Sequence, residues 1–171
     1  SVLRSWNPRL SDVAASPRFQ PEVARRLGLR AFTEPAARGG AFEMKRFVVS
    51  PVDFLRDVLT QLDANSIGAM ACIYMAGDKL AAPVVFTSRE SDALDLLGAE
   101  KNKVIPAMQA HKGTFLAVSI APDGSSNWTF RHPTIREAFA AHIADDPNMV
   151  RILLMGLTNE ELHRQIDCGG S

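Results

Sequence analysis

His132 is the residue whose type and position best suit chemistry in this chain. Alternating apolar residues lead to Phe130, a His-Pro pair follows, and an amphipathic helical pattern then begins. This pattern places the imidazole at a corner between a strand and a helix N-terminus. Unpaired backbone N–H groups and the helix dipole both attract anions there, so a phosphate is the expected ligand. The alternative is that His132 only caps the helix and hydrogen-bonds locally.

Other patterns typical of catalytic sites are missing from the sequence. It contains no Gly-x-x-x-x-Gly-Lys-Ser/Thr loop, no Gly-x-Gly-x-x-Gly and no Gly-x-Ser-x-Gly. His111, His132, His142 and His163 show no ligand spacing, and His142 lies on the apolar stripe of its helix. We therefore expect that the chain is not an enzyme by itself and that it holds no metal.

The composition is that of a globular protein, with 46% hydrophobic and 22% charged residues. The formal net charge of zero argues against a strongly electrostatic role with nucleic acid or membrane. No run of 18 apolar residues predicts a membrane span. Cys72 lies in an apolar run and Cys168 in the tail, which indicates no disulfide framework and favours a cytoplasmic location.

The neutral total hides an uneven distribution of charge. Residues 1–50 carry nine Lys or Arg against four Asp or Glu, and residues 51–100 carry three against eight. A basic N-terminal third could meet phosphate or an acidic partner. It could equally dock on the acidic middle of the same chain.

The residue spacing predicts a mainly α fold with a small β-hairpin. Helices are expected over 21–29, 51–62, 66–77, 88–97, 103–111, from 134, over 147–156 and from 158, and strands over 114–120 and 127–131. The expected caps are Ser50, Asn65 or Ser66, Thr134 with Glu137, and Asp146. Pro106 should interrupt the helix over 103–111, and Leu94, Leu96 and Leu97 should face the core.

Three helices followed by a hairpin and more helix give the element order of a winged helix. Residues 34–43 are rich in Pro, Ala and Gly and indicate a linker. The expected domains are a helical lid with linker over 1–45, a winged-helix-like domain over 46–145, and C-terminal helices with a tail over 146–171. The abrupt ends of the sequence suggest part of a longer protein.

The segment from Trp128 to Phe139 resembles the Phe-x-His-Pro-Ser-Phe-Arg-Asp-Phe signature of bacterial STAND-class signalling NTPases, specifically the family called novel STAND NTPase three. Residues 17–19 and 21–27 are similar to the helical lid of that family, and residues 47–48 and 51–55 to its next helix. Residues 75–77 and 80–83 also resemble it.

In that class, a P-loop core binds ADP or ATP with Mg, and a helical lid and a winged helix close over the nucleotide. The resemblance matches His132 with the histidine of the Met-His-Asp motif that related NB-ARC proteins place at the ADP β-phosphate. Arg131 stands where the methionine would be, and Pro133 where the aspartate would be. Pro17 and Arg18 match a lid position that approaches the nucleotide.

The resemblance implies a regulatory lid and winged-helix fragment whose parent protein is an NTPase in signalling or anti-phage defence. Its partner would be the P-loop core of the same parent, through which oligomers could form. The fragment alone is expected to bind no ADP, ATP or Mg, no membrane and no nucleic acid.

Two other interpretations stay open. A DNA-binding winged helix would place the helix near residues 89–97 in a major groove. That helix carries Glu90, Asp92 and Asp95 against Arg89, and this charge repels phosphate. A protein-interaction module with no nucleotide role is the second.

Overall fold

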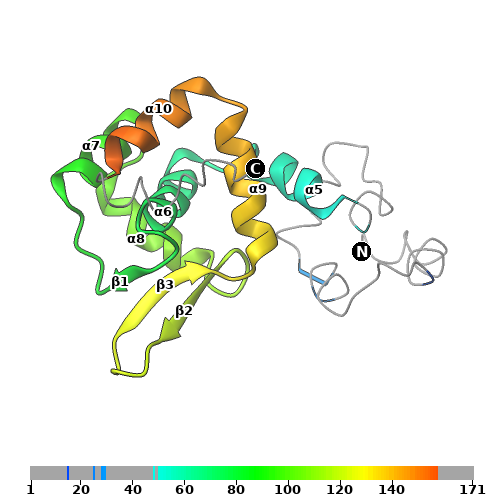
Figure 1. Ribbon diagram of the computed structural model, residues 1–171, viewed down its shortest axis with the longest axis horizontal. Coiled ribbons are helices and arrows are strands. Elements are labelled where there is room, and N and C mark those ends of the chain that lie inside the picture. Colours follow the sequence, from blue (N-terminus) through cyan, green and yellow to red (C-terminus); the bar gives the residue numbers. More distant parts are fainter. Residues whose placement is uncertain (1–14, 16–24, 26–27, 30–47, 49, 158–171) are drawn as a thin grey trace, which may run out of the picture. The chain divides into compact units, whose positions relative to one another are not determined.

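The computed structural model describes residues 15, 25, 28, 29, 48 and 50–157 (Figure 1). The chain divides into two compact units, residues 1–61 and 62–171. Pro17, Arg18, His163 and Cys168 lie outside the described residues, as do most of the helix expected over 21–29 and the helix expected from Thr158. The predicted domain boundaries therefore stay predictions.

In the first unit, α5 spans Pro51–Leu59. Pro51 occupies the first helical turn, where a missing N–H costs nothing. Ser50 stands at the N-cap position but makes no side-chain capping hydrogen bond, so its predicted capping role is wrong. The apolar side of α5 is buried: Phe54, Leu55, Val58 and Leu59.

The second unit is mainly helical with a small antiparallel sheet, as the sequence predicts (Figure 1). Its elements are α6 (Ala64–Met75), β1 (Leu80–Ala82), α7 (Ser88–Leu96), α8 (Lys101–Ala110), β2 (Leu116–Ile120), β3 (Ser126–Phe130), α9 (Pro133–Ala144) and α10 (Pro147–Gly156). The strand order is β1-β3-β2. Along the chain, one helix, a strand, two helices and a hairpin follow one another before the last two helices. The three-residue strand β1 was not predicted.

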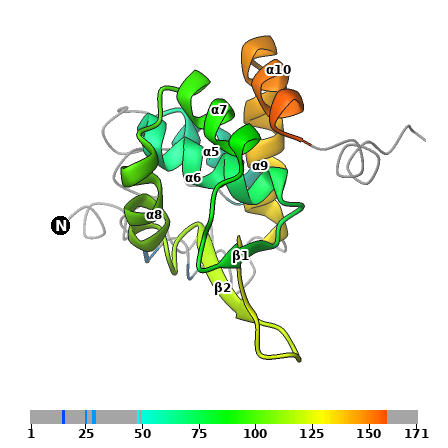
Figure 2. The same ribbon diagram turned by 90° about the vertical axis from the view of Figure 1, so that its left-hand side faces the viewer.

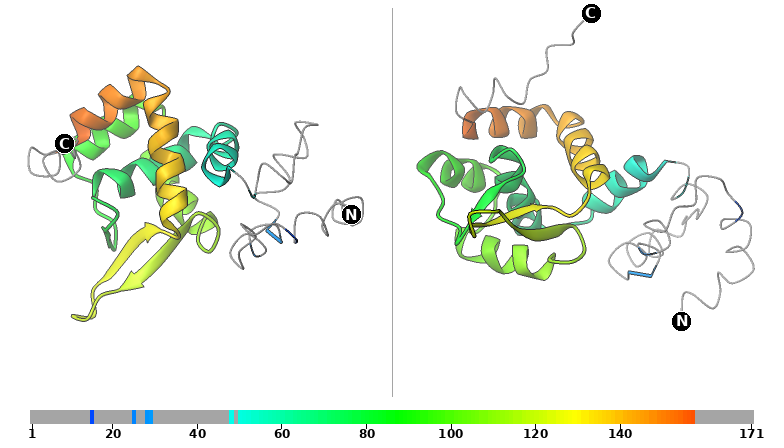
Figure 3. Two further views of the ribbon diagram at one scale, coloured as in Figure 1. Left: turned by 45° about the vertical axis from the view of Figure 1, so that its right-hand side comes forward. Right: turned by 60° about the horizontal axis from the view of Figure 1, so that its bottom comes forward.

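The sheet buries one face through its central strand. Trp128 of β3 pairs with Leu80 of β1 on one side and with Val118 of β2 on the other. Cross-strand partners share a face of the sheet, so these three side chains lie together. Trp128 and Leu80 are buried. Beyond them, the β2–β3 hairpin extends away from the helices (Figures 1 and 3).

Helix α6 is the centre of the second unit. It is apolar on nearly all sides, as predicted, and contacts α7, α8, α10 and β3 (Figure 2). Gly68 allows the closest approach, because a Cβ there would lie 2.8 Å from both Ala99 Cβ and Leu94 Cδ2. The helix begins at Asp63, whose side chain accepts from Ser66 N–H at 2.7 Å. The expected cap at Asn65 or Ser66 is therefore wrong by two or three residues.

Helix α7 is fixed at both ends by local hydrogen bonds. Thr87 and Glu90 form a capping box that the sequence analysis missed. At the other end, Gly98 adopts φ +72° and Ala99 N–H donates to Leu94 O. Leu94 is fully buried as predicted, but Leu96 is 55% exposed, so its assignment to the core is wrong.

Helix α8 differs from its prediction in two ways. It begins at Lys101 and continues through Pro106, which was expected to interrupt it. Val104 and Met108 are fully buried, and α8 packs on α6, so burial offsets the hydrogen bond that proline removes. Helix α8 also directly precedes the hairpin.

The last two helices close the unit. Helix α10 packs on α7 and α9, and Arg89 Nη1 donates to Leu157 O at 3.0 Å (Figure 1). Asp146 caps α10 as predicted, accepting from Asn148 N–H at 2.8 Å. Within the described residues, no helix is both long enough and apolar enough to cross a bilayer.

We expect Gly68→Ala to lower the free energy of unfolding by about 1–3 kcal/mol, because the added Cβ overpacks the contact of α6 with Ala99 and Leu94. Urea denaturation followed by circular dichroism measures the change. Asp92→Ala, at an exposed position of α7, is the control and should change it by less than about 0.5 kcal/mol. Equal stability of Gly68→Ala and the wild type would contradict the close packing.

Candidate functional site

The corner between β3 and α9 is where the sequence places the candidate site, and the structure confirms this position for His132. β3 ends at Phe130, and Arg131 N–H donates to Phe115 O at 2.9 Å. His132 is then extended (φ −152°, ψ 143°), as the residue before a proline prefers. Pro133 starts α9 with its fixed φ. The His-Pro pair thus turns the chain from strand to helix.

His132 caps α9 with its own imidazole. Nδ1 accepts from Thr134 N–H at 3.2 Å and lies 2.9 Å from Thr134 Oγ1. The local capping alternative for His132 is therefore confirmed. The capping box predicted for Thr134 and Glu137 is wrong, because Pro133 already occupies the first helical position and moves Thr134 inside the helix.

The capping bond fixes the chemistry of the ring. An Nδ1 that accepts a backbone N–H must carry its lone pair there, so the neutral imidazole holds its proton on Nε2. His132 is half-buried rather than enclosed in an apolar interior. The cap uses Nδ1, and the Nε2–H group is the donor of the ring.

Arg136, one turn into α9, fixes the helix to the end of α6. It forms an ion pair with Asp78, and its guanidinium carbon lies 5.3 Å from the Tyr74 ring centroid. Burial raises the pKa of Asp78, and the Arg136 charge opposes that rise. Asp78 follows α6 in the left-handed region (φ 67°), so the backbone turn directs this carboxylate towards α9.

Aromatic rings connect the same corner to the interior. The Phe130 and Phe139 centroids lie 5.7 Å apart, and those of Phe139 and Tyr74 lie 5.8 Å apart in an edge arrangement. Phe139, Ile135 and Ile143 are buried, as predicted for the packing face of α9. The start of α9 is therefore tied to α6 by both apolar and charged contacts.

Two exposed cations lie beside the corner. A Cβ at Gly113 would stand 4.0 Å from Arg131 Nη1, so this guanidinium lies at the turn between α8 and β2, next to Lys112. Among the described residues, neither Arg131 nor Lys112 forms an ion pair. Two such cations would suit an anion.

A second polar pair, which the sequence did not reveal, joins α6 to α8. His111 Nε2 lies 2.8 Å from Ser66 Oγ, and the His111 ring packs edge-on against Phe115 at 5.3 Å. A hydroxyl this close to an imidazole is the contact of a nucleophile with its base. Ser66 is only 6% exposed, however, and Asp63 is occupied by capping α6. The arrangement is that of a hydrogen bond between two packed helices.

In the part of the chain that the structure describes, the remaining candidate groups form no further site. Within the described residues, no three His, Cys, Asp or Glu side chains gather as metal ligands. Cys72 is fully buried, as predicted, and burial raises the pKa of its thiol well above the usual range. His142 is half-buried with its ring 6.4 Å from Phe139, which agrees with a packed helix residue.

Comparisons with models of protein families, with curated proteins and with solved structures found no match. The likeness to STAND NTPases therefore stays a prediction from short motifs.

We expect His132→Ala to destabilise the second unit by about 1 kcal/mol, because Thr134 N–H loses its acceptor. His132→Asn should keep most of the stability, since an asparagine oxygen can accept the same N–H. Urea denaturation of both variants beside the wild type measures the difference. Equal loss in the two variants would contradict a capping role.

His111 should make stability depend on pH. Burial lowers the pKa of His111, with Asp63 opposing, so the unfolded chain takes up the proton at a higher pH than the folded chain. Stability should therefore fall as the pH drops below the ordinary histidine value of about 6.5, until the lowered folded pKa is passed.

Denaturation midpoints measured at steps between pH 8 and pH 5 would test this. The His111→Gln variant should lose that part of the slope, because its amide does not titrate. Ser66→Ala is the matched control. It removes the hydrogen bond and should lower the free energy of unfolding by about 1 kcal/mol. Because it keeps His111, the dependence of stability on pH should remain. An unchanged slope in His111→Gln would refute the assignment.

Proposed function

We propose that this chain is the regulatory lid and winged-helix part of a bacterial STAND-type ATPase, and that it senses ADP or ATP held by a P-loop core of the same parent protein. The observation that carries the proposal is the imidazole of His132, which caps α9 through Nδ1 and keeps its proton on Nε2. The family motif places a histidine with a phosphate contact at the same sequence position.

The corner supplies what a phosphate needs. Its anion-facing groups are a ring N–H donor, the positive end of a helix of 12 residues, and the cations Arg131 and Lys112 beside it. Pro133 stands where the family motif has an aspartate, which is a departure from that motif. The locking role of that aspartate is not part of the proposal.

The contacts of α9 give a route from the ligand to the rest of the unit. A phosphate bound at His132 would act on the first turn of α9, which Arg136 joins to Asp78 and Phe139 joins to Tyr74. A change at the nucleotide would therefore reach α6 through packed groups. In the parent protein, this would control signalling or anti-phage defence.

The nucleotide and its Mg would be held by the P-loop core, which supplies phosphoryl-transfer chemistry. This chain would contribute a phosphate contact only. Pro17 and Arg18 remain predicted lid contacts, because they lie outside the described residues.

The first test is the gene itself. The natural reading frame should encode a Gly-x-x-x-x-Gly-Lys-Ser/Thr loop upstream of Ser1. A frame without an ATPase module would overturn the proposal.

The second test uses the full-length parent protein. We expect His132→Asn to weaken the binding of a fluorescent ADP analogue about tenfold or more, because the cap survives but the Nε2–H donor is lost. Titrations with the wild type, with His132→Asn and with the exposed-site control Glu137→Gln would measure this. If His132→Asn binds the ADP analogue as tightly as the wild type, the proposal is wrong. The chain would then be a protein-interaction module without a nucleotide role.

A further inference from the structure

Strand β2 forms an edge of the sheet that no neighbouring strand covers. The strand order β1-β3-β2 leaves one side of β2 open, and in the part of the chain that the structure describes no further strand pairs with it there. The hairpin projects from the helices (Figures 1 and 3). Ile120, near its tip, is 76% exposed although its side chain is entirely apolar. This open edge has no part in the proposed nucleotide contact.

Hydrogen bonds at the two ends of β2 show which of its backbone groups face the open side. At the start, Arg131 N–H donates to Phe115 O at 2.9 Å, and past the end, Ala121 N–H donates to Ser125 O at 2.8 Å. Residues that bond the partner strand alternate along an antiparallel pair. The odd-numbered residues of β2 therefore bond β3, and the even-numbered residues turn their N–H and C=O groups to the open edge.

The first even-numbered residue, Leu116, is already bonded on this outer side. Gly113 N–H donates to Leu116 O at 2.8 Å, and Leu116 N–H donates to His111 O at 3.1 Å. The open edge is thus confined to Val118 and Ile120. It offers two N–H and two C=O groups at the spacing of a strand.

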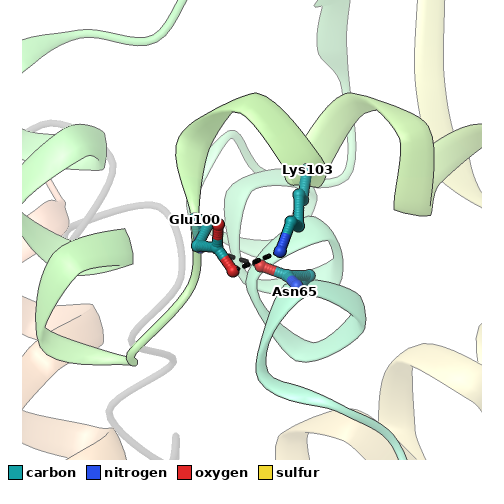
Figure 4. A network of polar contacts seen from close by, with 3 residues as sticks. All are labelled: Asn65, Glu100 and Lys103. Carbon is teal, nitrogen blue, oxygen red and sulfur yellow. Dashed lines mark hydrogen bonds and ion pairs between the residues drawn. The ribbon is translucent and has the colours of Figure 1, made fainter.

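The helix that leads into β2 holds this edge in a fixed place. At the start of α8, Glu100 N–H donates to Asn65 Oδ1 of α6 at 2.8 Å, and Lys103 pairs with the Glu100 carboxylate (Figure 4). Just after the last turn of α8, His111 Nε2 lies 2.8 Å from Ser66 Oγ. Because α8 is joined to α6 at both ends, β2 starts from a fixed turn.

Strand β2 also lacks the features that keep edge strands from pairing, which are charged side chains, prolines and bulges. Residues 116–121 include no charged residue and no proline. Each residue of β2 has one partner on β3, so no bulge interrupts the strand. The one carboxylate of the hairpin, Asp123, accepts hydrogen bonds from Ser125 within the turn. Two such edges can therefore approach each other without charge repulsion.

We propose that two copies of this chain join through β2, antiparallel about a two-fold axis at Ser119, so that two three-stranded sheets become one sheet of six strands. Val118 then lies opposite Ile120 of the partner subunit, and the two residues exchange both of their hydrogen bonds. The symmetry repeats this pair, so every open N–H and C=O group of both edges is satisfied. A strand that supplies matching donors and acceptors to its own copy needs no other partner.

The register follows from the bonds that Leu116 already makes. A pairing centred on Val118 would place Leu116 opposite Ile120 of the partner subunit, although the outer groups of Leu116 are taken by the preceding turn. A pairing centred on Ser119 avoids this conflict. Val118 and Ile120 share the sheet face of the buried Trp128, so the pairing also covers Ile120 with an apolar neighbour.

Sedimentation velocity of the full chain at increasing protein concentration tests the association. The contact is far smaller than a standard interface of about 1,600 Å², so we expect a weak, reversible dimer. Ile120→Lys should raise its Kd about tenfold or more, because it places a charge at both meeting edges. Val85→Lys is the matched control. It makes the same charge change at a site that is 81% exposed, between β1 and α7, and should leave Kd unchanged.

Cross-linking tests the register. Opposite residues of a non-hydrogen-bonded antiparallel pair have Cα atoms about 4.5 Å apart, which is within the range of a disulfide. Ser119→Cys, in a chain that also carries Cys168→Ser, should therefore give a disulfide-linked dimer on mild oxidation. Ala81→Cys in the same background is the control and should stay monomeric, because it lies in line with Ser119 across Asn127 but on the opposite edge of the sheet.

Three outcomes would overturn the proposal. One is a folded chain that stays monomeric at every concentration tested. Another is equal weakening of the dimer by Ile120→Lys and Val85→Lys, or equal cross-linking of Ser119→Cys and Ala81→Cys. The last is a dimer that survives Ile120→Lys but is lost when residues 158–171 are removed, which would assign the contact to that segment. These measurements involve no nucleotide, so their failure and that of the His132 test are distinct.

Discussion

The burial of α6 is the constraint on which the rest of the second unit depends. Eight of its twelve residues are buried, so the helix must be covered on every side. Helices α7, α8 and α10 and strand β3 provide that cover. Gly68 brings Ala99 and Leu94 within contact of the α6 backbone, and any larger residue would force them apart. The places of α8 and of the sheet are set by this packing.

The candidate site inherits its geometry from that packing. β3 packs against α6 and carries the buried Trp128, and the chain leaves β3 directly into the His-Pro corner. Arg136 and Asp78 then fix α9 to the end of α6. Helix α8 buries Val104 and Met108 against the same core. A histidine with a defined ring orientation therefore follows from this packing.

Capping and phosphate sensing do not compete for His132. The cap uses Nδ1 and contributes about 1 kcal/mol to folding. An anion would be met by Nε2–H, whose proton is kept in place by the cap. The structural role thus prepares the ring for the proposed function, and an asparagine at this position separates the two roles.

Features that depend on near neighbours along the chain could be predicted from the amino-acid sequence. The helices over 51–59, 64–75, 88–96 and 147–156 and the hairpin could be predicted, because apolar spacing and Asp146-Pro147 act within a few residues. The strand-to-helix corner at His132 was predictable for the same reason. The cap of α9 was misplaced because Thr is the more common capping residue, whereas Pro133 in fact fixes the helix start.

Features that depend on distant partners are set by the packing of the folded chain and could not be predicted from local patterns. The strand β1 exists because β3 supplies its hydrogen bonds, and α8 survives Pro106 because α6 buries its other side. Ser66 and His111 are 45 residues apart, so no short sequence pattern predicts their contact. The exposure of Leu96 likewise follows from which faces the neighbouring elements cover.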